Sequence, residues 1–177
     1  MLRRTALLCL VAGLLATFAA GCGDDTKTVT SGAANGQTTT RTVPDVKFAK
    51  TKFVLHTGLA IGAFRRWIYR PLRAGKLKRG ADGRTKALVK AALAGAFTVK
   101  ELKSARNAAL SDEKLRGLGD KMTVLISKTQ GLLPGLRSGN LDPGGLAGIA
   151  AGLSSVTALA NGLGVNVEER SVPTPSG

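Results

Sequence analysis

Residues 84–109 read RTKALVKAALAGAFTVKELKSARNAA, and this stretch decides the fold that the sequence predicts. Apolar and small side chains recur in it at steps of three and four residues, while most of the charged side chains fall between them. That period is typical of an α-helix with one buried face. The face that we expect to be buried consists of Leu88, Ala92, Gly95, Val99 and Leu102.

A helix of the same kind is expected before this stretch. Residues 46–70 carry large apolar side chains, such as Phe53 and Phe64, at helical spacing. Arg70 precedes Pro71, and the residue before a proline is pushed out of the helical region of backbone space. The sequence therefore predicts that the first helix ends at Arg70.

Two more helices are expected after it, and each has a start signal. Ser111 is expected to cap the third helix, because a serine oxygen can accept a hydrogen bond from a free amide of the first turn. Asp142 followed by Pro143 predicts the start of the last helix, which we expect to run to about residue 162. The face of the third helix that we expect to be buried consists of Leu115, Leu118, Met122, Leu125, Thr129 and Leu132.

The composition is typical of a helical core made of small and aliphatic side chains. Hydrophobic residues make up 44% of the chain and aromatic residues only 4%, and there are 23 glycines. We therefore predict an all-α fold, a small bundle of about four helices over residues 46–164. Residues 22–45 are rich in threonine and poor in bulky apolar residues, so we expect them to form a flexible, disordered tether, and residues 165–177 a disordered tail.

The first 22 residues have the organisation of an export signal. Arg3 and Arg4 precede an uncharged apolar run, and small residues then precede Cys22. The residues AAGC that end at Cys22 resemble the lipobox of bacterial lipoprotein precursors, although the family usually has leucine where this chain has Ala19. The resemblance implies that residues 1–21 are a signal peptide, that cleavage occurs before Cys22, and that lipid on Cys22 anchors the protein at the exported face of the cell membrane. An ordinary secretory signal followed by a free Cys22 is the alternative.

Positive charge is concentrated between residues 65 and 90. The chain has 26 Lys and Arg against 11 Asp and Glu, a formal net charge of +15, and Asp82 is the only acid in this segment. With Trp67 and Tyr69 beside it, the cluster is suited to anionic lipids or acidic wall polymers. The alternative is that these charges only stabilise the end of the first helix or face water. The residues predicted to bind an anionic surface are Arg65, Arg66, Arg70, Arg73, Lys76, Lys78 and Arg79.

Small residues recur at every fourth position in three stretches, at Gly58 and Gly62, at Ala91 and Gly95, and from Gly144 to Gly152. Such spacing permits close packing of helices, either in a membrane or, as we expect here, in the core of a soluble bundle. Residues 144–167 carry no charge and are long enough to cross a membrane. Their glycines and polar residues favour a buried or interfacial helix, with a membrane-spanning helix as the alternative.

The inventory of reactive side chains argues against an enzyme. The sequence has no triad-type spacing and no glycine-rich phosphate loop, and its adjacent acids have plain explanations as a helix start and a tail. We therefore expect neither catalytic residues nor a cofactor. His56 is the only histidine, and without a second histidine or a free cysteine we expect a packed core residue rather than a metal ligand. Nucleic acid is not an expected partner of an exported protein.

These observations predict a membrane-tethered, basic helical lipoprotein that acts as a binding or structural module at the outer face of the cell membrane. The alternative is a carrier that holds an apolar small molecule between its helices, in a cavity lined by Phe53, Phe64 and Phe97. Residues 56–77 resemble parts of uncharacterised exported bacterial proteins, and that resemblance implies no function. The sequence does not identify a protein partner.

Overall fold

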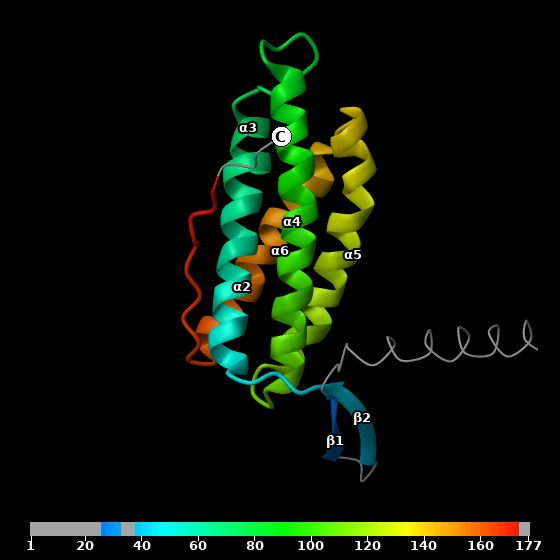
Figure 1. Cartoon of the computed structure of the whole chain (residues 1–177), viewed down its shortest axis with the longest axis vertical. Coiled ribbons are helices and arrows are strands. Elements are labelled where there is room, and N and C mark those ends of the chain that lie inside the picture. The colour runs from blue at the N-terminus through cyan, green and yellow to red at the C-terminus, as the bar shows by residue number, and fades with distance from the viewer. Residues whose placement is uncertain (1–25, 33–37, 174–177) are drawn as a thin grey trace, which may run out of the picture.

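The structure is a computed structural model that describes residues 26–32 and 38–173. Four helical stretches pack together in it as a bundle (Figure 1), which confirms the all-α prediction. The predicted signal peptide and Cys22 lie outside the described residues. The long helices that follow the first stretch are α4 (Arg84–Ser111), α5 (Arg116–Ser138) and α6 (Pro143–Gly162).

The first helical stretch is longer than the sequence predicted. It consists of α2 (Ala49–Phe64), a π-helical turn η1 (Arg65–Tyr69) and the short helix α3 (Arg70–Arg73). In a regular α-helix the ring of Pro71 would collide with the carbonyl four residues earlier. The π-helical turn widens the helix just before Pro71, and the amide of Arg70 donates to the carbonyl of Arg65, five residues back. The helix therefore passes through Pro71, and the predicted end at Arg70 is wrong.

The core lies between the helices and is made mainly of aliphatic and small side chains. On α4, the predicted face is buried except for Ala92, which is half-buried, and on α5 only Leu132 of the predicted face is half-buried. Phe53 and Phe64 of α2 are fully buried in the same core. Each large apolar side chain removed from water in this way contributes about 1.5–3 kcal/mol.

The start of α6 agrees with the prediction, whereas the start of α5 does not. The carboxylate of Asp142 accepts a hydrogen bond from the amide of Gly145 at 3.0 Å, and Pro143 is the first helical residue. Ser111 was expected to cap α5, but it belongs to the last turn of α4. The carboxylate of Asp112 accepts hydrogen bonds from the amides of Lys114 and Leu115 in the turn before α5, and no side chain caps α5 itself at Leu115.

Part of the expected tether is a β-hairpin. The strands β1 (Thr26–Gly32) and β2 (Thr38–Pro44) pair antiparallel, with Thr28 opposite Thr42. Alternating threonines favour strands because their branched side chains fit a pleated surface. The hydroxyl of Ser111 then fixes the hairpin to the bundle, since it donates to the carbonyl of Pro44 and accepts from the amide of Val46.

The expected disordered tail is packed over residues 165–173. After α6 the chain runs back along α2 (Figure 1), with Val165, Val167 and Val172 buried. The amide of Arg170 donates to the carbonyl of Gly58 at 3.0 Å. A Cβ at Gly58 or Gly62 would overlap the backbone of the tail. An extended segment therefore packs against these two glycines, and not a second helix as expected.

Other small residues do allow close contact between helices. Gly95 of α4 lies against the side chains of Leu133 and Leu136 of α5, and Gly152 of α6 lies against Leu125. Gly148, in the same predicted stripe as Gly152, faces open space. The four-residue spacing thus identified some contacts between helices but did not identify the partner of each stripe.

Candidate anion-binding groove

A groove with basic walls lies at one end of the bundle, where the connector between α3 and α4 meets the ends of both helices. It has a volume of about 760 Å³. We call it the basic groove. Its lining residues are Arg66, Trp67, Arg70, Pro71, Ala74, Lys76, Asp82, Gly83, Lys86, Ala87 and Lys90.

The connector is held in place by its own residues. It turns at Gly75, Gly80 and Gly83, whose φ angles of 72°, 80° and 66° are disfavoured for residues with a side chain. Leu77 is only 2% exposed and inserts into the bundle. The guanidinium of Arg84 donates to the carbonyl of Leu77 at 3.2 Å and to the carbonyl of Gly139 at 2.8 Å, so it ties the connector to the end of α5. One cation of the segment therefore has a structural role.

The side of the groove next to η1 is organised around Trp67. The guanidinium carbon of Arg66 and the ammonium of Lys90 each lie 5.2 Å from the centroid of the indole ring. Cations at this distance from an aromatic face are attracted by its quadrupole. Trp67 thus brings together one cation from η1 and one from α4, although the two residues are far apart in the sequence.

The electrostatic balance of the basic groove is strongly positive. Its lining has five cations and one acid, Asp82. Within the described residues only one of these cations, Arg70, pairs with an acid, and its nitrogen lies 4.0 Å from an oxygen of Glu169. Lys76 and Lys86 are exposed. The groove therefore presents several ammonium and guanidinium groups to any anion that enters it.

The structure divides the seven predicted residues into three groups. Arg66, Arg70 and Lys76 line the basic groove. Arg65 and Arg73 line a second groove, between α6 and the first helical stretch. The remaining two, Lys78 and Arg79, are exposed on the connector.

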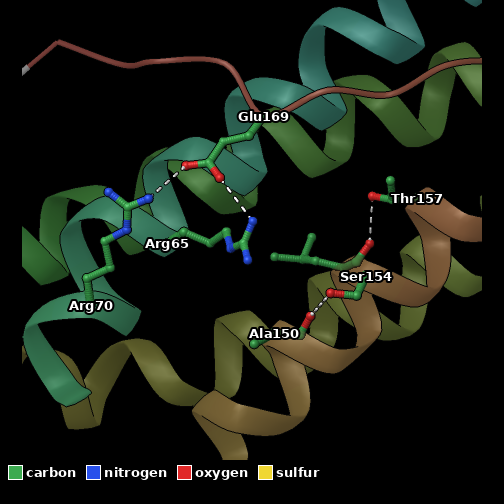
Figure 2. Close-up of polar contacts among 7 residues, drawn as sticks. Arg65, Arg70, Ala150, Ser154, Thr157 and Glu169 are labelled. Carbon is green, nitrogen blue, oxygen red and sulfur yellow. Dashed lines mark hydrogen bonds and ion pairs between the residues drawn. The ribbon is translucent and has the colours of Figure 1, made fainter.

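The carboxylate of Glu169 connects the two faces on which these arginines lie. Arg65 donates to Glu169 at 3.0 Å, and Arg70 approaches the same carboxylate from the other side (Figure 2). Glu169 belongs to the tail that was expected to be disordered. The position of this acid at the border of the cluster was therefore not predicted.

Lys86 and Lys90 belong to the basic groove but were not among the predicted residues. They lie four residues apart, which places them on one face of α4. Their proximity to Arg66 and Arg70 results from the packing of α4 against η1, which no local pattern indicates. The available signals were their membership in the charged segment from residue 65 to 90 and their four-residue spacing.

The lone histidine lies away from both grooves. The Nδ1 atom of His56 is 2.6 Å from a carboxylate oxygen of Glu101, which joins α2 to α4. Within residues 26–32 and 38–173, no group of three His, Cys, Asp or Glu side chains is arranged to hold a metal ion. The contact between His56 and Glu101 connects two helices of the core.

One helix of the described residues, α6, is long and apolar enough to cross a membrane. Only 28% of its most apolar 18-residue window is buried in the bundle. Core helices of soluble proteins can have the same length and composition, so these two features do not show that α6 spans a membrane.

The chain matches no protein-family model, and no curated protein or solved structure is significantly similar to it.

Proposed function

We propose that the protein is a membrane-tethered binding module whose basic groove holds an acidic polymer at the exported face of the cell membrane. The observation that carries this proposal is the convergence of five cations, from η1, α3, the connector and α4, around a groove with one acid. Oriented cations of this number create a positive field that attracts a polyanion. Of the ten cations between residues 65 and 90, Arg84 has a clear structural role, because its guanidinium bonds the connector to the end of α5; Lys76 and Lys86 are exposed.

The tether that this proposal requires is short. Thr26 pairs with Pro44, which is bonded to Ser111 at the end of α4. Only four peptide units join Cys22 to Thr26, and at full extension they span about 14 Å. A lipid on Cys22 would therefore hold this end of the bundle close to the membrane, and two acyl chains are sufficient for stable anchoring.

The basic groove lies at the opposite end of the bundle from this anchor. The hairpin adjoins the last turn of α4, whereas the connector adjoins its first turn (Figure 1). From Lys86 to Ser111 the helix rises about 38 Å, at 1.5 Å per residue. This distance exceeds the screening length of about 8 Å at physiological salt. In a bundle that stands on its anchor, the groove therefore faces away from the bilayer, which favours an acidic polymer over anionic lipid.

The proposal is tested with the chain from residue 22 onward, in which Cys22→Ser prevents lipidation. We expect it to bind a polyphosphate or polyglutamate chain at low salt, with binding that weakens between 0.05 and 0.5 M salt, where screening becomes stronger. Lys76→Glu with Lys86→Glu should abolish binding and leave the circular dichroism spectrum unchanged, since both side chains are exposed.

The matched control is Lys50→Glu with Lys52→Glu, which makes the same change in charge at the other end of the bundle, where both side chains are also exposed. We expect this control to retain most of the binding. If both pairs weaken binding equally, only net charge is sensed and the groove is not a site. Binding to vesicles of anionic lipid without binding to either polymer would identify the bilayer as the partner instead.

The carrier alternative has less support from the fold. Phe53 and Phe64 fill the core between α2 and α4 and are 0% exposed. Phe97 is half-buried, and none of the three phenylalanines lines either of the two grooves described above. The cavity predicted for the carrier therefore has no counterpart in these grooves.

A further inference from the structure

The least buried of the four long helices, α6, borders a groove of about 690 Å³. We call it the α6 groove. Its floor is made of the buried side chains of Ile61, Leu153 and Val167, which come from three different segments. Its volume falls within the range of about 300–1,000 Å³ that is usual for sites that hold small molecules.

The wall that α6 contributes has four alanines and a leucine, together with the polar residues Ser154, Thr157 and Asn161. Ser154 donates to the carbonyl of Ala150 at 3.1 Å, and Thr157 donates to the carbonyl of Leu153 at 3.0 Å (Figure 2). Both hydroxyl protons are therefore occupied within the helix. The rest of this wall consists of Asn161, whose side-chain oxygen accepts a hydrogen bond from the amide of Val167, and of alanine methyl groups along which an alkyl chain can lie.

Charge is confined to the opposite side of the same groove. Arg65, Arg73 and Glu169 line it there. Arg65 bonds to Glu169, whereas Arg73, at the end of α3, pairs with no acid in the described part of the chain. The lining thus has an apolar wall that faces a wall with one excess cation, and this arrangement complements a molecule with an alkyl chain and an acidic head.

We propose that the α6 groove binds one molecule of an anionic amphiphile, such as a fatty acid or a lysophospholipid. Its alkyl chain lies along α6 and its acidic head binds Arg73, with Arg65 beside it. This site is separate from the basic groove and does not depend on the function proposed for it. A concave groove that is charged on one side fits a single amphiphile better than the flat surface of a bilayer.

The experiment measures the contribution of the alkyl chain to binding separately from that of the acidic head. Dodecanoate, dodecanol and acetate are titrated, each below the concentration at which it aggregates, into residues 22–177 with Cys22→Ser, and amide chemical shifts are followed by NMR. We expect saturable binding of dodecanoate at one site, with shifts centred on Ala147, Ala151 and Ala158. Dodecanol should bind about tenfold more weakly because it lacks the charge that Arg73 recognises, and acetate should not bind.

Two substitutions and their controls locate the site. Ala151→Trp fills the groove from an exposed position and should abolish binding, whereas Ala96→Trp, at an exposed position of α4 outside the groove, should not. Arg73→Glu should weaken dodecanoate about tenfold and leave dodecanol unchanged, and Arg79→Glu should affect neither. The proposal is overturned if dodecanoate does not bind, if Ala151→Trp binds it normally, or if only vesicles of anionic lipid bind.

Discussion

Nδ1 of His56 on α2 lies 2.6 Å from Oε2 of Glu101 on α4. The Glu101 side chain is 6% exposed and the His56 side chain 26%. Among the residues whose side-chain burial the structure describes, Glu101 is the only acidic or basic one that is buried. The pair therefore joins two core helices through the one carboxylate that the fold removes from water.

Removing His56 should destabilise the protein, because it leaves the carboxylate of Glu101 buried without its partner. His56→Ala is expected to lower the free energy of unfolding by about 2–3 kcal/mol, less than for a fully buried pair because His56 is partly exposed. In the Glu101→Gln background, His56→Ala should lower the free energy of unfolding by much less. Urea denaturation of the four proteins of this double-mutant cycle measures the coupling.

Glu113→Gln provides the matched control, since Glu113 is exposed. It should change the free energy of unfolding by less than about 0.5 kcal/mol. If the costs of His56→Ala and Glu101→Gln simply add, the contact does not stabilise the fold.

A second prediction concerns two glycines that have opposite surroundings. A Cβ at Gly62 would overlap the backbone of Arg170, whereas a Cβ at Gly148 would meet nothing within 4 Å. Alanine is about 1 kcal/mol more favourable than glycine in a helix. We expect Gly148→Ala to stabilise the protein by up to about 1 kcal/mol and Gly62→Ala to destabilise it by about 1–3 kcal/mol, because the tail must move.

Limited proteolysis provides an independent measurement of the same effect. Gly62→Ala should expose the tail, so cleavage after Arg170 by trypsin should become faster than in the wild type. Gly148→Ala should leave the rate of this cleavage unchanged. Equal stabilisation by both substitutions would show that the tail is not docked on α2 in solution.

The helices were predictable because their signals are local. The period of apolar residues identified α4 and the buried face of α5, and Asp142 with Pro143 marked the first turn of α6. The tail and the hairpin could not be predicted in this way. Their structure depends on contacts with residues that are distant in the sequence: the glycines of α2 for the tail, and Ser111 for the hairpin.

The candidate site was predictable as a region but not in its geometry. The run of cations was evident from the sequence. Because the helix was expected to end at Arg70, the distribution of these cations between two grooves was not predicted. Once the helix continues through Pro71, Arg66 and Arg70 share one face, and Arg65 and Arg73, eight residues apart, share another. The contribution of Lys86 and Lys90 required knowledge of how α4 packs against η1.

Ser111 should stabilise the junction between hairpin and bundle. Ser111→Ala removes the hydroxyl that bonds to both Pro44 and Val46, and the expected cost is about 1–2 kcal/mol because the site is buried. Hydrogen exchange at the amide of Val46 should become faster, since its acceptor is lost. Ser155→Ala, at an exposed position of α6, is the control, and a similar effect of both substitutions would contradict a specific role for Ser111.

Lipidation of Cys22 should determine both the location of the protein and the orientation of its bundle. Cys22→Ala should prevent incorporation of labelled fatty acid and release the protein from the membrane fraction. Cys9→Ala should change neither, because Cys9 lies in the segment that is expected to be removed. Membrane retention and labelling of the Cys22→Ala protein would contradict the anchor.

The orientation can be measured on the anchored protein, in which acylated Cys22 has no free thiol. Asn107→Cys places a fluorophore near the anchored end of α4, and Arg79→Cys places one on the connector; both positions are exposed. The two labels should differ by about 35 Å in their distance from the bilayer, given the rise of the helix between them. A quencher in the lipid headgroups should therefore affect the label at residue 107 much more strongly. A flexible glycine–serine insertion after residue 25 should reduce this difference, and equal quenching without the insertion would show that the basic groove does not face away from the membrane.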